Sequence, residues 1–122
     1  MSSTEMNILV VDDDPAVRDA LKFSLELEGF KVHACRDGWE LLAHGALRDS
    51  DCIVLDYRMP GLDGLSVLNQ LAMRKVEAPV ILITGPIPEN LRSRALRAGA
   101  RLVLEKPLLD GVLTDKIREL TH

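Results

Sequence analysis

The segment Ile53-Val54-Leu55-Asp56-Tyr57-Arg58-Met59-Pro60-Gly61 decides the fold class of this chain. Three apolar residues run directly into an aspartate, and a Pro-Gly turn follows soon after it. A continuous apolar run is typical of a strand buried on both faces, as in a parallel sheet covered by helices. Because ligands bind at the carboxyl ends of such strands, Asp56 is expected at the bottom of a functional site.

The same pattern recurs along the whole chain. Apolar strands are expected at residues 7–11, 30–35, 52–55, 79–83 and 102–104. Segments with helical spacing of apolar residues separate them, and Asp14 followed by Pro15, Asp37 and Asp63 are expected N-caps. The alternation predicts an α/β fold with helices on both faces of a parallel sheet. With 122 residues and no shift in composition, residues 1–122 are expected to form one domain, ordered from about residue 6 to 120.

The expected helices carry apolar residues at helical spacing, which define their buried faces: Val17, Leu21 and Leu25 in the first, and Leu65, Leu68, Leu71 and Ala72 in the third. The fourth helix, ending at Gly99, has its stripe at Leu91, Ala95 and Leu96, and the last helix has Leu109, Leu113, Ile117 and Leu120. The second helix, after Asp37, is expected to fade at Gly45.

Composition excludes several classes of protein. The chain is 47% hydrophobic and 28% charged, and its net charge of −4 argues against non-specific nucleic-acid binding as its main activity. Its two cysteines, Cys35 and Cys52, are expected to be buried reduced thiols. No apolar run has transmembrane length, and residues 1–5 lack the features of a signal peptide. We therefore expect a cytoplasmic protein that does not contact a membrane.

Polar residues gather where the apolar strands end. The first strand ends in Asp12-Asp13, the third in Asp56, the fourth in Thr84, and the fifth near Lys106. In a parallel sheet these ends share one edge. Singly, Thr84 would be an ordinary strand-end residue and Lys106 a solvated lysine, and acidic residues here could simply cap a helix. Their joint placement favours a functional site.

The acidic side chains at this edge need compensation. Two like charges about 4 Å apart cost roughly 4 kcal/mol at an effective dielectric constant near 20. A divalent cation would remove this cost, and an all-oxygen ligand set favours Mg²⁺ or Mn²⁺ over zinc. Lys106 adds an ammonium, Thr84 a hydroxyl and Gly85 an accessible backbone N–H, which together would stabilise a transferring phosphoryl group. Aspartate can accept a phosphoryl group covalently, so Asp56 is the predicted acceptor.

Four segments resemble the receiver domains of two-component response regulators. They are Val10-Val11-Asp12-Asp13-Asp14-Pro15, Leu55 to Gly61, Ile83-Thr84-Gly85 and Glu105-Lys106-Pro107. The resemblance covers nearly the whole chain. Among receivers, the chain is similar to those of the nitrogen-fixation regulator type. The resemblance implies a flavodoxin-like (βα)5 fold with a five-stranded parallel sheet in the order 2-1-3-4-5.

The resemblance also implies residue roles. Asp56 would accept a phosphoryl group from a sensor histidine kinase or a phosphotransfer protein. Asp13, Asp56 and the Arg58 backbone carbonyl would ligate Mg²⁺, with Asp12 acting largely through water. Thr84 and Lys106 would contact the phosphoryl oxygens, and the Lys106-Pro107 bond is expected to be cis. Such a domain is a phosphoacceptor regulator rather than an enzyme, and catalyses only its own phosphotransfer and dephosphorylation.

One position departs from the family pattern. Receivers usually carry Phe or Tyr three residues before the lysine, and here that residue is Val103. The loop after Thr84 also contains Pro86 and Pro88, which restrict the backbone. Both features predict a weakened or altered conformational switch.

The sequence does not decide which surface of the domain contacts its downstream target. Arg92, Arg94, Arg97 and Arg101 make the region of the fourth helix basic. This is either a solvated face or a docking face for an acidic partner or a second copy, including a homodimer through the fourth helix and fifth strand. No aromatic residues interleave the arginines, which disfavours nucleic acid. The chain ends at His122, and either a single-domain regulator or a separated output domain agrees with that.

Three other functions compete with a phosphorylation switch. An aspartyl-phosphate phosphohydrolase commonly has a second aspartate two residues after the nucleophile, where this chain has Arg58. A nucleotide-binding domain would need a glycine-rich loop, which the chain lacks. A degenerate receiver acting only as a protein-binding module is supported mainly by Val103.

Overall fold

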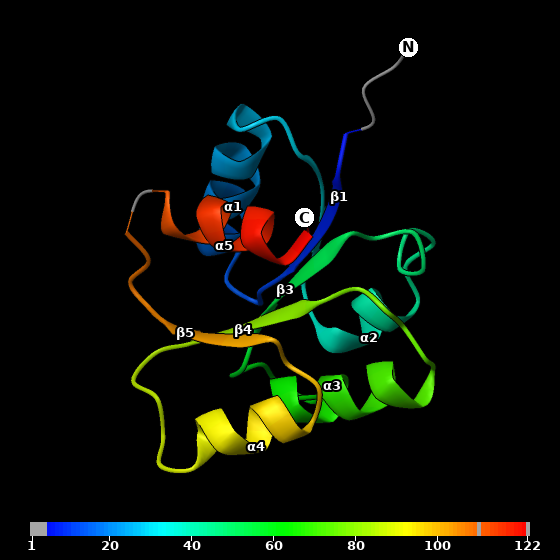
Figure 1. Ribbon diagram of the computed structural model, residues 1–122, viewed down its shortest axis with the longest axis vertical. Coiled ribbons are helices and arrows are strands. Elements are labelled where there is room, and N and C mark those ends of the chain that lie inside the picture. The colour runs from blue at the N-terminus through cyan, green and yellow to red at the C-terminus, as the bar shows by residue number, and fades with distance from the viewer. Residues whose placement is uncertain (1–4, 110, 122) are drawn as a thin grey trace.

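The strands form one parallel five-stranded sheet, in a computed structural model that describes residues 5–109 and 111–121. The sheet order is β2-β1-β3-β4-β5. The strands are β1 (Asn7–Val11), β2 (Lys31–Cys35), β3 (Cys52–Asp56), β4 (Val80–Thr84) and β5 (Leu102–Glu105). This arrangement confirms the expected fold and places β1, β3 and β4 in the centre of the sheet (Figure 1).

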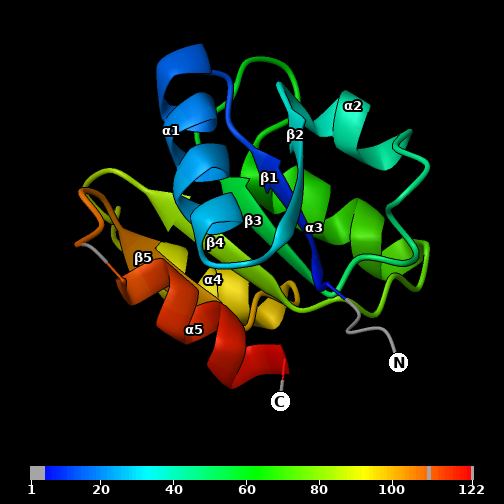
Figure 2. The same ribbon diagram turned by 90° about the horizontal axis from the view of Figure 1, so that it is seen from above.

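Five helices connect the strands and cover both faces of the sheet. They are α1 (Pro15–Leu27), α2 (Gly38–Leu42), α3 (Gly64–Met73), α4 (Leu91–Arg97) and α5 (Val112–Thr121). Helices α1 and α5 lie on one face, and α2, α3 and α4 lie on the other (Figures 1 and 2). Each face has its own aliphatic cluster, with Ile8, Val54 and Ile81 on the α1/α5 side and Leu9, Leu55 and Leu82 on the other. Alternate residues of each central strand therefore serve opposite cores.

The expected helix starts are confirmed. Asp14 accepts a hydrogen bond from the Ala16 N–H, Asp37 from Glu40, and Asp63 from Ser66. Each cap satisfies a backbone N–H that the first helical turn leaves unpaired. Cys35 and Cys52 are free and buried, as expected.

Several sequence-based boundaries were wrong by one residue. Strands β3, β4 and β5 extend to Asp56, Thr84 and Glu105. Asp56 and Thr84 are therefore the last residues of their strands and do not follow them. Backbone pairing continues because Asp56 pairs with Ile83 and Thr84 pairs with Glu105.

The predicted apolar stripes also need correction. Leu109 is not in the last helix, which begins at Val112, and its side chain is 75% exposed. Leu96 lies on the outer side of α4 and is 47% exposed. Apolar spacing alone could not show where a helix begins or how much of a short helix its neighbours cover.

Gly64 fixes the position of α3 beneath the end of β3. A Cβ at this position would lie 2.7 Å from Leu82 Cδ1 and 2.9 Å from Tyr57 Cα, closer than packed carbons approach. The Gly64 N–H also donates to the Tyr57 carbonyl at 2.9 Å. Glycine therefore lets the helix start directly against the strand that carries Asp56.

Within the part of the chain that the structure describes, no helix is both long and apolar enough to span a bilayer. Residues 1–4, on which the absence of a signal peptide partly rested, lie outside the described residues.

Candidate functional site

Two aspartates end neighbouring strands at the same edge of the sheet. Asp56 is the last residue of β3 and is 7% exposed, while Asp12 directly follows β1 and is 2% exposed. The Asp12 N–H donates to the Cys35 carbonyl at 3.1 Å, and the Tyr57 N–H donates to the Ile83 carbonyl at 2.8 Å. These backbone bonds extend the sheet past its strand ends and hold both carboxylates in place.

Asp13 completes a cluster of three carboxylates. Oxygen atoms of Asp12, Asp13 and Asp56 all lie within 4.8 Å of one another. Asp12 Oδ1 accepts from the Asp14 N–H at 2.9 Å, which orients its other oxygen toward the cluster. Asp13 is exposed, so the cluster opens to solvent on one side. Three converging carboxylate oxygens fit a hard divalent cation, which takes oxygen ligands and retains several waters.

Lys106 brings the compensating positive charge. Its Nζ lies 3.3 Å from Asp12 Oδ2 and 3.6 Å from Asp56 Oδ2. Its backbone N–H donates to the Thr84 carbonyl at 2.7 Å, which ties the lysine to the end of β4. The Lys106-Pro107 bond is cis, as expected. The ammonium thus bridges two of the three carboxylates.

The environment of Asp56 disfavours its charge. Burial raises the pKa of the Asp56 carboxyl to about 6, and the neighbouring Asp12 and Asp13 add to the effect. Lys106 and a hydrogen bond from the Arg58 backbone oppose it but do not cancel it. The site is therefore short of positive charge, which is the condition that a bound cation would relieve.

Thr84 has an unusual hydroxyl. The residue is fully buried, and its Oγ1 has no hydrogen-bond partner among the described residues. Buried hydroxyls are nearly always paired, and leaving one unpaired costs roughly 1–3 kcal/mol. Beside it, a Cβ on Gly85 would meet no atom within 4 Å, so packing does not require the glycine. The hydroxyl at the end of β4 is thus a buried donor without a partner among the described residues.

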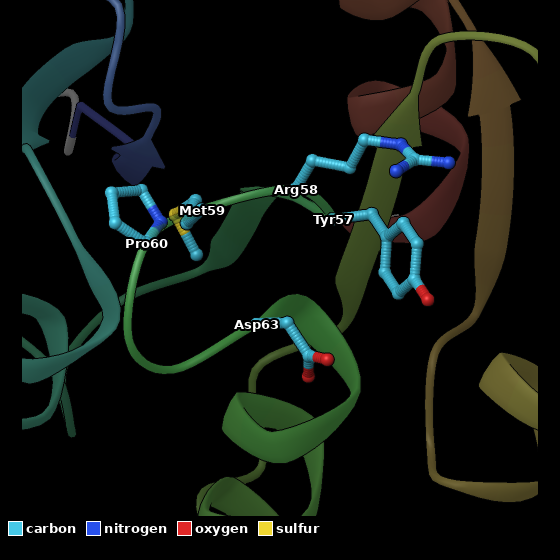
Figure 3. A pocket seen from close by; sticks show the side chains of 5 residues that line it. All are labelled: Tyr57, Arg58, Met59, Pro60 and Asp63. Carbon is cyan, nitrogen blue, oxygen red and sulfur yellow. The ribbon is translucent and has the colours of Figure 1, made fainter.

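The loop after Asp56 forms a shallow depression. Tyr57, Arg58, Met59, Pro60 and Asp63 line it, with a volume of about 420 Å³. Figure 3 shows the Arg58 and Tyr57 side chains on one side of the loop and Met59 and Pro60 on the other. The Arg58 guanidinium lies 5.8 Å from the centre of the Tyr57 ring and is exposed. The depression thus lies along the loop that directly follows Asp56.

Sequence reasoning missed Arg18. Its Nη1 donates to the Asp12 backbone carbonyl at 2.9 Å from the first turns of α1. The contact ties the first turn of α1 to the residue that follows β1. It joins residues six positions apart across the start of the helix, so helical spacing gave no signal for it.

The comparisons with known proteins agree on one family. Residues 8–118 match the response regulator receiver domain. The chain is 40% identical over 114 residues to C4-dicarboxylate transport transcriptional regulatory protein DctD of Pseudomonas aeruginosa, covering 93% of this chain and 25% of that protein. It is 37% identical over 115 residues to transcriptional regulatory protein FixJ of Bradyrhizobium diazoefficiens, covering 94% and 56%. The chain spans about a quarter to a half of the length of these curated relatives.

Solved structures give the same result. The crystal structure of FixJ-N has a TM-score of 0.86 and 31% identity, covering 98% of this chain and 95% of that one. The chemotaxis protein CheY4 of Vibrio cholerae has a TM-score of 0.89 at 24% identity, covering 96% and 99%, and supports the fold alone. The fold, the carboxylate cluster and these matches lead to one conclusion: the chain belongs to the receiver domain family of two-component response regulators.

Proposed function

We propose that this domain is a phosphorylation-controlled signalling switch whose phosphoacceptor is Asp56. The observation that carries the proposal is the position of the Lys106 ammonium, within 3.6 Å of both Asp12 and Asp56 at the edge of the sheet. A buried carboxylate beside a fixed cation and a cation-binding cluster has what a phosphoryl acceptor needs.

The donor would be a phosphohistidine on a sensor histidine kinase or a phosphotransfer protein, since receiver domains interact with histidine kinases. The bond between the histidine nitrogen and phosphorus breaks, and a bond forms between phosphorus and a carboxylate oxygen of Asp56. The released nitrogen keeps the electron pair and takes a proton from solvent. This chain's residues position and stabilise the transferring group and need no separate general base.

The residues fit Mg²⁺, with Mn²⁺ as the alternative. Asp13 and Asp56 would hold the ion through carboxylates, Arg58 through its backbone carbonyl, and Asp12 largely through water. The ion would neutralise negative charge that develops on the phosphoryl oxygens. The cluster of three carboxylates and the raised pKa of Asp56 support this assignment.

Thr84 and Lys106 would contact the phosphoryl oxygens directly. The unpaired Thr84 hydroxyl would then gain a hydrogen bond, which favours movement of the β4–α4 loop toward Asp56. Lys106 would exchange part of its contact with carboxylates for one with the phosphoryl group. This exchange is the step that converts a covalent modification into a conformational change.

The wider assignments follow from the same proposal. Residues 1–122 would act as a single receiver domain in the cytoplasm, without binding nucleic acid or membrane directly. Catalysis would be limited to its own phosphorylation and dephosphorylation. Dimerisation through the face of α4 and β5 remains a secondary proposal.

Incubation with acetyl phosphate and MgCl₂, followed by intact mass spectrometry, tests the proposal. We expect a mass increase of one phosphoryl group that is labile to base and lost in Asp56→Asn. Asp49→Asn is a matched control, because Asp49 is exposed and outside the cluster.

Other outcomes point to the competing functions. Absence of an adduct in the wild type would favour a degenerate receiver that only binds protein. Rapid multiple turnover of the donor would favour a phosphohydrolase. An adduct that persists in Asp56→Asn would place the acceptor elsewhere.

A further inference from the structure

A groove lies between α3 and α4, away from the carboxylate cluster. It has a volume of about 310 Å³ and is lined by Leu65, Asn69, Arg94, Arg97 and Ala98. The two helices run side by side on the same face of the sheet (Figure 1). We call this feature the α3–α4 groove.

Each wall of the α3–α4 groove has a distinct chemistry. Leu65 and Asn69 are four residues apart on α3, and Met73 continues the same line with its side chain 74% exposed. Residues at this spacing share one face of a helix. On the opposite wall, Arg94 and Arg97 are three residues apart and therefore also share a face. The α3 wall of the groove thus combines the apolar side chain of Leu65 with the amide of Asn69, and the α4 wall is cationic.

The two arginines are not neutralised within the described residues. Neither Arg94 nor Arg97 forms an ion pair or a side-chain hydrogen bond there, and no carboxylate lines the groove. Three cations on other surfaces have acidic partners one turn away or across a helix end: Lys22 with Glu26, Lys116 with Glu119, and Arg118 with Glu28. In a chain of net charge −4, the groove is a local excess of positive charge.

We propose that the α3–α4 groove is a docking site for an acidic amphipathic helix of a partner protein. Carboxylates one helical turn apart on such a helix would match Arg94 and Arg97, because guanidinium groups pair with carboxylates in two-bond contacts. The apolar face of the helix would cover Leu65 and Met73, as in other helix-in-groove complexes.

Charge and polarity together select this occupant. Nucleic acid would use the arginines but would leave Leu65, and the exposed Met73 further along the same face of α3, without a partner. The α3–α4 groove shares no residue with the carboxylate cluster, so docking is tested without a phosphodonor.

The test is titration of the full chain with a model peptide, followed by amide NMR and calorimetry. The peptide is a capped 16-residue helix of leucine and alanine on one face, with glutamates at i and i+4 beside them. A second peptide with glutamine in place of every glutamate is the control. We expect amide shifts confined to α3 and α4, and weaker binding as salt increases.

Two variants with the same change in net charge make the test specific. Arg94→Gln with Arg97→Gln should weaken binding at least ~10-fold, the effect of about 1.4 kcal/mol. Arg36→Gln with Lys31→Gln removes two exposed charges in or directly after strand β2, away from α3 and α4, and should change binding less than ~2-fold by the same relation. Thermal unfolding of each variant shows whether it is folded.

Four results would overturn the proposal. They are no groove shifts at millimolar peptide, equal binding of the glutamine peptide, and equal losses in the two double variants. The fourth is evidence for a different occupant. A DNA duplex that shifts the groove amides at lower concentration than the peptide would indicate nucleic acid, and groove shifts that depend on the concentration of the chain itself would indicate a second copy of the chain.

Discussion

The ammonium of Lys106 donates a hydrogen bond to Asp12 Oδ2 at 3.3 Å, although 94 residues separate the two in the chain. The contact joins the loop after β5 to the end of β1, across the whole width of the site. Because the same nitrogen lies 3.6 Å from Asp56, the pair sets the electrostatic state of the acceptor. The first prediction follows from this shared charge.

Removal of the ammonium should disable the acceptor. Lys106→Gln leaves the cluster of carboxylates without its fixed cation, so the Asp56 pKa should rise above about 6. We expect phosphorylation by acetyl phosphate to slow at least ~10-fold, the effect of about 1.4 kcal/mol in the barrier. The rate comes from phosphate-affinity gels. Lys31→Gln, an exposed change, is the control, and an unchanged rate in Lys106→Gln would contradict the role.

Neutralising Asp56 should stabilise the metal-free domain. A pKa raised from 3.8 to about 6 means that charging Asp56 costs folding free energy, up to about 3 kcal/mol for two pKa units. In EDTA at pH 7.5, Asp56→Asn should therefore raise the free energy of unfolding by about 1–3 kcal/mol. Urea denaturation measures it. The gain should shrink toward pH 4, where the wild-type carboxyl also becomes neutral; a gain independent of pH would require another cause.

Protons should compete with the cation. The folded state of the metal-free domain binds more protons at Asp56 than the unfolded state between pH 4 and 6, so this group's contribution to stability falls as pH rises through that window. Mg²⁺ affinity should change in the opposite sense, falling up to tenfold per pH unit below about pH 6.

Trp39 provides a signal for this titration, because its Nε1 lies 3.6 Å from where a Cβ of Gly61 would be, in the loop after Asp56. It is the single tryptophan of the chain. Calorimetry gives an independent affinity. An affinity that is the same at pH 5 and pH 7.5 would contradict the raised pKa.

Removing the Thr84 hydroxyl should preserve or increase stability but impair the conformational switch. Thr84→Val removes a buried hydroxyl that has no partner, so we expect the free energy of unfolding to stay the same or to rise by about 1 kcal/mol. The same variant should lose the amide shifts that beryllofluoride, a phosphoryl mimic, induces in the β4–α4 loop. Thr84→Ser keeps the hydroxyl and should retain those shifts. A loss of stability above about 1 kcal/mol in Thr84→Val would indicate a hydrogen bond that the native state makes.

The face of α4 should move little on activation. Val103 is 2% exposed and has no ring that could change position, and Arg92 Nη1 donates to the Val103 carbonyl at 3.0 Å, tying α4 to β5. Beryllofluoride with Mg²⁺ should therefore cause only small amide shifts in α4. Arg92→Gln should release the tether and enlarge them, whereas Ser93→Ala on the same helix should not. Large shifts in the wild type would show that the signal passes through α4 without an aromatic residue.

Local patterns explain why much of the fold could be predicted. Buried strands such as Ile53–Leu55 are apolar on both faces, and capping aspartates such as Asp14 and Asp63 act within a few residues of their own position. The errors arose where burial depends on a neighbour. Leu96 and Leu109 have helical spacing in the sequence but are exposed, because no helix or strand among residues 5–109 and 111–121 covers them.

The sequence by itself determined the alternation of strands and helices and the strand ends that carry Asp12, Asp56, Thr84 and Lys106, because periodicity and strand-end polarity are local properties. Only the tertiary structure decided that one ammonium contacts two carboxylates, that the buried Thr84 hydroxyl has no partner among the described residues, and that Arg94 and Arg97 line a groove with Leu65. These relationships depend on distances between atoms from segments far apart in the chain, and electrostatic and hydrogen-bond energies change steeply with such distances.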